Sequence, residues 1–175
     1  MASPIQRTLQ THRNHYLFAD YYLDNRVMEQ SDWQTVDVTA VFSEIAALWR
    51  AFTPHHDNES QTEEEWIRPV LKALGHTFNV QVPLKTPFGV RKPDYILYPT
   101  EAARQSAKAK SGAFDSQDLQ PTALAVADAK AWERNLDQTP ATKKELNISG
   151  NPSLQIYVYV QHSGLPWGIL TNGRY

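Results

Sequence analysis

The stretch ALAVADAK, at residues 123–130, decides how this chain is expected to fold. Residues 123–129 are small and apolar apart from Asp128, which is typical of a short strand buried on both faces. Asp128 and Lys130 end this strand, and they should project from the same face because alternate side chains of a strand do so. A carboxylate and an ammonium group that are merely buried cost free energy, so this pair is a candidate functional site.

A second acidic residue begins another expected strand. Asp94 directly follows Pro93 in the segment KPDYI, and residues 94–98 have the composition of a strand. Mg²⁺ prefers carboxylate and carbonyl oxygens together with water molecules in an octahedral arrangement. Asp94, Asp128 and the backbone carbonyl of Ala129 could supply three of these ligands. The sequence therefore predicts a Mg²⁺ site at these residues, at which Mn²⁺ would substitute.

The remaining segments predict an α/β or α+β arrangement around these strands. Apolar side chains recur at helical spacing over residues 41–52, which predicts a helix. Further strands are expected at residues 77–82 and 168–171. The tryptophans expected in the core are Trp66, Trp132 and Trp167.

A second helix is expected before the first strand, with two alternative starts. Thr62 and Glu65 have the spacing of a capping box, and Ser60 with Glu63 offers a second register. Gly75 stands where a C-terminal cap belongs.

Two segments are expected to differ from this core. Residues 99–121 are rich in small and polar side chains, and we expect them to form a mobile loop inserted between two strands. Residues 1–56 are expected to form an N-terminal helical arm packed on the core, which would comprise residues 57–175.

Composition excludes several classes of protein. The 175 residues contain no cysteine, which rules out disulfides, a thiolate nucleophile and a cysteine zinc site. There is no apolar run long enough to cross a membrane and no secretory leader, so a cytoplasmic location is expected. The net charge of −2 is unlike that of a stand-alone nucleic-acid binder. Affinity for DNA would therefore have to come partly from another domain or subunit.

A series of short motifs in residues 57–174 follows a recognisable order. These motifs are Asn58–Glu63, Ile67–Leu71, Leu74-Gly75, Lys92–Tyr95, Asp128–Trp132, Asn151-Pro152, Gln155, Tyr159 and Trp167–Gly173. The series resembles the nuclease domains of the PD-(D/E)XK superfamily. It is most similar to the N-terminal domains of type IIG restriction–methyltransferase proteins and to type I restriction subunits. Residues 1–50 show no such resemblance.

The resemblance implies a fold and an activity. The fold would be a PD-(D/E)XK-type α/β core, with a small mixed sheet flanked by helices. The activity would be Mg²⁺-dependent hydrolysis of DNA phosphodiesters in a restriction or phage-defence protein. Asp94 and Asp128 would hold the metal, and Lys130 would orient the attacking water or stabilise charge on the phosphate. A Gln-x-x-x-Tyr motif would place Gln155 near the phosphate or the lysine, supported by Tyr159.

The resemblance also implies a glutamate from the upstream helix, whose identity stays open between Glu59, Glu63 and Glu64. Glu63 is favoured because it shares an apolar stripe with Ile67 and should point toward the sheet. Glu59 fits the Asn-Glu pattern of the family, whereas Glu65 would be occupied by capping.

The conformation of one segment and the exact function also stay open. Residues 156–160 have the propensity of a strand, whereas the resemblance requires a helix there. The main functional alternative is a catalytically degenerate nuclease fold that serves as a DNA-binding or assembly module. A third possibility is a nuclease directed at RNA or at branched DNA. Because related proteins continue beyond the position of Tyr175, we expect methyltransferase, target-recognition or helicase domains outside this chain, and a transient dimer on DNA.

Overall fold

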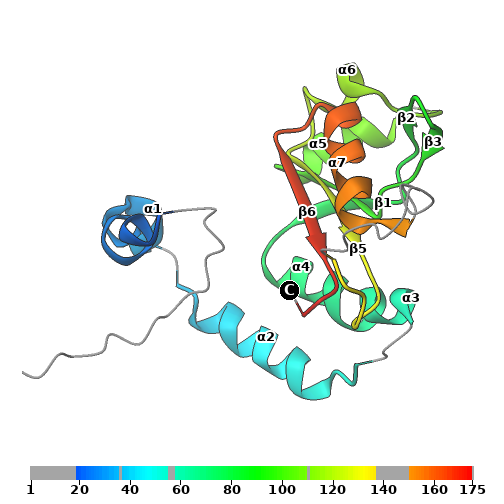
Figure 1. Ribbon diagram of the computed structural model, residues 1–175. Helices are drawn as coiled ribbons and strands as arrows, with labels where there is room; N and C mark the ends of the chain where they lie inside the picture. The colour runs from blue at the N-terminus through cyan, green and yellow to red at the C-terminus, as the bar shows by residue number, and fades with distance from the viewer. Residues whose placement is uncertain (1–18, 36, 55–57, 110, 137–149, 175) are drawn as a thin grey trace, which may run out of the picture. The chain divides into compact units, whose positions relative to one another are not determined.

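The computed structural model describes residues 19–35, 37–54, 58–109, 111–136 and 150–174 (Figure 1). The chain divides into two compact units, Met1–Ala40 and Val41–Tyr175. This boundary lies earlier than the one expected after residue 56, because the end of helix α2 (Thr39–Ala51) packs with the rest of the second unit through aromatic side chains. That residues 1–56 pack as an arm on the core stays a prediction.

The described part of the first unit is helical, as expected for the N-terminal segment. Its elements are η1 (Tyr22–Arg26), η2 (Val27–Glu29) and α1 (Ser31–Thr35). All three are single turns or little more, and none of their residues is buried.

A mixed sheet forms the centre of the second unit. Among the described residues its strands are β1 (Thr77–Val80), β4 (Tyr95–Tyr98), β5 (Ala125–Ala129) and β6 (Trp167–Thr171), in the order β1-β4-β5-β6. Strand β4 is antiparallel to both β1 and β5, whereas β5 and β6 are parallel and are connected through helix α7 (Pro152–Ser163). A separate hairpin consists of β2 (Leu84–Thr86) and β3 (Gly89–Arg91). The expected mixed α/β class, with a small sheet flanked by helices, is confirmed.

The helix before β1 packs on one face of the sheet. It consists of α3 (Glu59–Thr62), a π-helical turn η3 (Glu63–Ile67) and α4 (Arg68–Ala73). Ile67 packs there against Tyr95 and Leu97 of β4 and against the alanines of β5. Because alanine projects only a methyl group, the helix can approach this face of the sheet closely.

The start of this helix differs from both predicted registers. Its cap is Asn58, whose side chain accepts a hydrogen bond from the backbone N–H of Gln61 at 3.0 Å. Asparagine is as strong a cap as serine or threonine, so the helix begins before either predicted capping box. Thr62 lies inside the helix, where its hydroxyl donates to the carbonyl of Asn58.

The opposite face of the sheet is covered by α5 (Glu101–Lys108), α6 (Ser116–Leu119) and α7. The expectation of a mobile loop over residues 99–121 was therefore wrong for its described part, which holds α5 and α6. Thr100 caps α5, and Asp115 with Asp118 forms a capping box on α6. Local capping and the burial of Leu119 order a segment whose composition indicated a loop.

Helix α7 settles the conflict over residues 156–160 in favour of a helix. Asn151 caps its start, Pro152 occupies the first turn, and Gly164 ends it with a left-handed backbone at φ +65°. These end signals and the packing of α7 on β5 and β6 outweigh the strand propensity of its β-branched and aromatic residues.

In the part of the chain that the structure describes, no helix combines the length and apolar character needed to cross a bilayer.

Candidate active site

The candidate site lies where β4 begins and β5 ends. Tyr95 pairs with Ala127 in the antiparallel register, so Asp94, one residue earlier, lies opposite Asp128. The backbone N–H of Ala129 donates to the Asp94 carboxylate at 2.7 Å and fixes its position. Two acidic residues from distant parts of the sequence are thus brought together, as predicted.

The upstream helix contributes two further carboxylates. One oxygen each of Glu59, Glu63 and Asp94 lies within 4.8 Å of the others. Glu59 and Glu63 are one helical turn apart, which puts both on the side of the helix that meets the strands. Glu64 is exposed and pairs with Arg68 at 2.5 Å, so it does not join this cluster.

Asp128 and Lys130 project together, as their alternation on the strand predicts. Their side chains form an ion pair at 2.5 Å and are only 2% and 12% exposed. The Lys130 ammonium also donates to the backbone carbonyl of Ala129 at 2.8 Å. The Oδ2 atom of Asp128 is nevertheless buried with no hydrogen bond of normal geometry among the described residues.

Burial and neighbouring charges change the acidity of this pair. Burial raises the pKa of Asp128 to about 7, and the Asp94 carboxylate adds to this effect while Lys130 opposes it. Burial by itself lowers the pKa of Lys130, but the negative charges of Asp128, Glu59 and Asp94 outweigh burial and raise that pKa overall. Lys130 therefore carries its positive charge at neutral pH.

Glu59 faces the same charged groups. Burial is the main cause that raises the pKa of Glu59, and Asp94 and Glu63 add to it, whereas the Lys130 ammonium lowers it. Its carboxylate also accepts a hydrogen bond from the backbone N–H of Ala131, the residue after Lys130. Glu59 therefore joins the helix to the segment that follows β5.

The Glu63 carboxylate contacts two residues for which the sequence analysis predicted no role. The Tyr95 hydroxyl donates to its carboxylate at 2.5 Å, and the Arg68 guanidinium lies 3.4 Å from the same oxygen. Burial and the bond to Glu63 raise the pKa of Tyr95, so its hydroxyl keeps the proton that it donates. The position of Tyr95 directly after Asp94 was the signal that could have identified it.

Gln155 and Tyr159 lie one turn apart on α7, and the Gln155 amide donates to the Tyr159 hydroxyl at 2.9 Å. Burial raises the pKa of Tyr159, and the charges of Asp128, Lys130 and Asp94 also act on it. The structure therefore brings Tyr159 close to the strand acids. Roles for Gln155 and Tyr159 in phosphate positioning stay predictions.

The donor set fits a hard divalent cation. Its side chains are carboxylates, which Mg²⁺ and Mn²⁺ prefer, and one oxygen from each of three of them lies within 4.8 Å of the others. Asp94 belongs both to the predicted set of Asp94, Asp128 and Ala129 and to the cluster with Glu59 and Glu63. The predicted ligand set stays a prediction, because Lys130 occupies Asp128 and the carbonyl of Ala129 here.

The raised pKa of Asp128 predicts a pH effect on the metal-free protein. The pKa of Asp128 is about 7 in the folded state, above its ordinary value of 3.8. Protonation of Asp128 therefore stabilises the folded protein, and this contribution to stability is lost as the pH rises toward 7. In EDTA, wild type should therefore lose stability relative to Asp128→Asn between about pH 5 and pH 8. Urea unfolding of both proteins at the two pH values measures this, and a constant difference would contradict it.

A scan of known protein families, a search of curated proteins and a search of solved structures find no match for this chain.

Proposed function

We propose that this chain is a metal-dependent nuclease domain that hydrolyses phosphodiester bonds in DNA. The observation that carries the proposal is the convergence of Glu59, Glu63 and Asp94 within 4.8 Å, beside the buried pair of Asp128 and Lys130. Four carboxylates (Glu59, Glu63, Asp94 and Asp128) thus meet two cations, Lys130 and Arg68, at one end of the sheet, and a bound cation would offset the excess of acidic groups.

The order of elements supports the same proposal. A helix, the antiparallel strands β1, β4 and β5, a crossover helix and the parallel strand β6 come in this order, with the β2–β3 hairpin and helices α5 and α6 inserted between them, as expected for the PD-(D/E)XK core that the sequence resembles. The resembling motifs fall on the matching elements: Asp94 at the start of β4, Asp128 and Lys130 at the end of β5, and Gln155 on α7. Their agreement with the topology makes a chance match of short motifs a poorer explanation.

A divalent cation would be held by Asp94 with Glu59 and Glu63, or with Asp128 and the Ala129 carbonyl. When bound, it would supply Lewis-acid polarisation of the scissile phosphate and make an attacking water more acidic. The side chains of the protein would contribute the remaining steps. Lys130 would stabilise the negative charge that develops on the phosphate oxygens, because its ammonium group is fixed by two contacts and stays protonated.

Glu59 and Glu63 would differ in role. Glu63 is buried and already occupied by Tyr95 and Arg68, so it would act mainly by positioning its neighbours. Glu59 is only partly buried and lies near Lys130, so it is our choice for the helix carboxylate that contacts metal or water. This assignment replaces Glu63 as the preferred candidate.

The biological setting follows from the resemblance and from charge. We propose a restriction or phage-defence protein in which other domains or subunits bring DNA to this site, since the chain itself carries a net charge of −2. Cleavage of both strands would then require a transient dimer on DNA.

The test combines metal binding with cleavage. Wild type should bind Mn²⁺ in calorimetry and should cut plasmid DNA in Mg²⁺ or Mn²⁺. Asp94→Asn and Glu59→Gln should each weaken Mn²⁺ binding by about tenfold or more and abolish cutting. The matched control is Glu65→Gln, an exposed glutamate on the same helix, which should behave as wild type.

Two outcomes would refute the nuclease assignment. Mn²⁺ binding without cutting of methylated or unmethylated plasmid would favour the catalytically degenerate DNA-binding module. Cutting that survives in Asp94→Asn would show that the activity comes from elsewhere. Cutting of RNA or branched DNA with duplex left intact would change the substrate class.

A further inference from the structure

The hairpin of β2 and β3 presents a rigid tip outside the four-stranded sheet (Figure 1). The Thr86 hydroxyl donates to the carbonyl of Gly89 at 2.7 Å and accepts from the N–H of Phe88 at 3.1 Å. Pro87 restricts the turn further, and Gly89 adopts the left-handed φ of +88° that the turn requires. These contacts fix the backbone of the turn at Phe88.

The base of the hairpin is anchored while its tip is not covered. Leu84 is completely buried, and the backbone of Lys85 bonds to the carbonyl of Phe114 at 2.8 Å. Phe88 and Val90, in contrast, are 56% and 59% exposed. A well-anchored hairpin that holds two large apolar side chains in solvent indicates a contact surface.

The charge of this segment identifies the kind of partner. Residues 84–93 contain three basic and no acidic side chains, although the whole chain has a net charge of −2. Lys85 is paired with Asp115 at 3.1 Å, and Arg91 and Lys92 are the other two cations of this segment. Lys92 is exposed, whereas Arg91 is partly buried and its Nε atom is inaccessible to solvent. Apolar tips flanked by cations suit a nucleic acid better than an acidic or an apolar protein surface.

The hairpin leads directly into the candidate site. Asp94 follows six residues after Phe88, so their Cα atoms are at most about 21 Å apart. This is about six base-pair steps of duplex DNA at 3.4 Å each. Phe88 and Asp94 can therefore contact the same duplex.

We propose that Phe88, with Val90 beside it, enters the minor groove of duplex DNA near the cleavage point and unstacks a base step there. Apolar side chains such as phenylalanine are used in this way by proteins that kink DNA. Lys92 would contact a neighbouring phosphate and contribute affinity without sequence preference. The inference rests on the proposed function only in that DNA is the substrate.

The experiment measures binding of the full chain to a fluorescent duplex in EDTA, so that no cleavage occurs. Phe88→Ala should weaken binding about tenfold, because loss of one base-stacking aromatic has this effect. A 2-aminopurine placed in the duplex should brighten on binding of wild type and not of Phe88→Ala. Lys92→Ala should lower the salt dependence of log K by about one unit without abolishing the 2-aminopurine signal.

The matched control is Trp167→Ala. Trp167 is an aromatic residue of similar exposure, 59%, and it lies opposite Ala125, at the other end of β5 from Asp128. It should bind DNA as wild type does.

The outcomes separate this inference from the nuclease proposal. Unchanged binding and 2-aminopurine signal in Phe88→Ala would overturn the hairpin contact, even if wild type cuts DNA in Mg²⁺. Phe88-dependent binding without any cutting would retain the hairpin contact and refute the nuclease. A wild type that fails to bind duplex DNA, or that instead binds only an unrelated protein through Phe88, would also overturn the inference.

Discussion

Replacing Lys130 with alanine is expected to slow DNA cleavage by about 100- to 1,000-fold, the usual effect of removing one preorganised group that stabilises transition-state charge. Lys130 is 12% exposed and is fixed by Asp128 and by the carbonyl of Ala129. Mn²⁺ binding should persist, because the predicted ligands are carboxylates and a carbonyl. Single-turnover cleavage assays with saturating protein measure the effect on the chemical step.

Removal of this ammonium group leaves Asp128 buried without its partner, so folding is measured in parallel. Lys130→Gln keeps a donor of similar length, and it should retain the near-UV spectrum of wild type while losing cleavage. Lys72→Ala removes an exposed lysine from the helix that carries Glu59 and should leave cleavage unchanged. Wild-type rates in a folded Lys130→Gln protein would exclude the proposed role of the ammonium charge.

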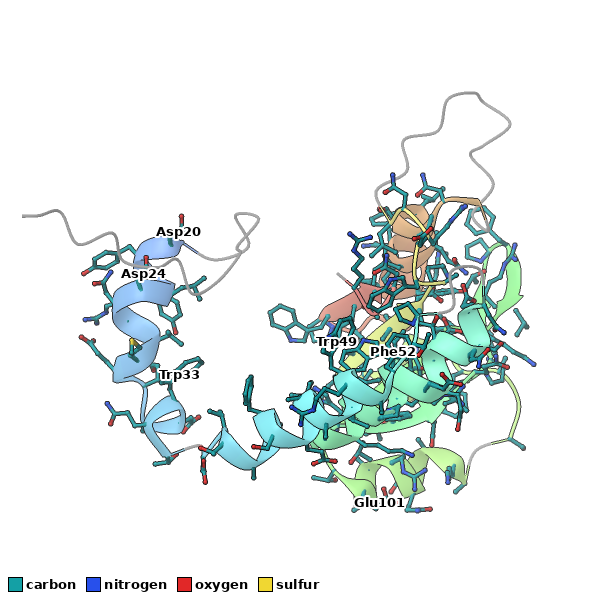
Figure 2. All side chains as sticks on the ribbon, turned by 90° about the horizontal axis from the view of Figure 1, so that it is seen from below. Asp20, Asp24, Trp33, Trp49, Phe52 and Glu101 are labelled. Atoms are coloured by element: carbon teal, nitrogen blue, oxygen red, sulfur yellow. The ribbon has the colours of Figure 1, made fainter. Side chains whose placement is uncertain are left out.

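Trp132→Ala is expected to lower the free energy of unfolding by about 3–5 kcal/mol, the range for truncation of a large buried aromatic. Trp132 is 8% exposed, and its ring lies 5.9 Å from that of Trp49 and 5.3 Å from that of Phe52. Trp49 and Phe52 themselves lie together at the end of α2 (Figure 2). Urea denaturation at constant pH measures the change.

The same substitution should also reduce cleavage, because Trp132 secures the segment just after Lys130. Trp66 joins the aromatic cluster from the helix that carries Glu63, and its indole N–H donates to the carbonyl of Gly173. Trp167→Ala provides the comparison, since an exposed side chain should change stability by no more than about 0.5 kcal/mol. Equal losses in the two variants would show that the cluster has no special role.

The central strands could be predicted because their sequences are unambiguous. Residues 123–129 form a short apolar run, and β5 is buried throughout. The even spacing of Asp128 and Lys130 then determined that they share a face, as their ion pair confirms. Local pattern sufficed here because strand geometry alone sets which side chains project together.

Features that depend on partners distant in the sequence were harder to predict. Trp167 was expected in the core, but β6 lies at the edge of the described sheet and leaves this side chain exposed. The choice between Glu59 and Glu63 could not be made from the sequence for a related reason. Both reach the site, and the difference between them comes from Tyr95 and Arg68, whose contacts with Glu63 no periodicity reveals.

The order of the sheet has a consequence for how the site forms during folding. The strand that carries Asp128 pairs with β4 across the long 99–121 segment and with β6 across a crossover that includes α7. Closing such long loops costs chain entropy before the strand contacts can compensate for it. Pairing of β5 with its two neighbours should therefore be slow. Asp128 should therefore join the other carboxylates late in folding, and the complete site should appear together with native tertiary structure rather than with early helix formation.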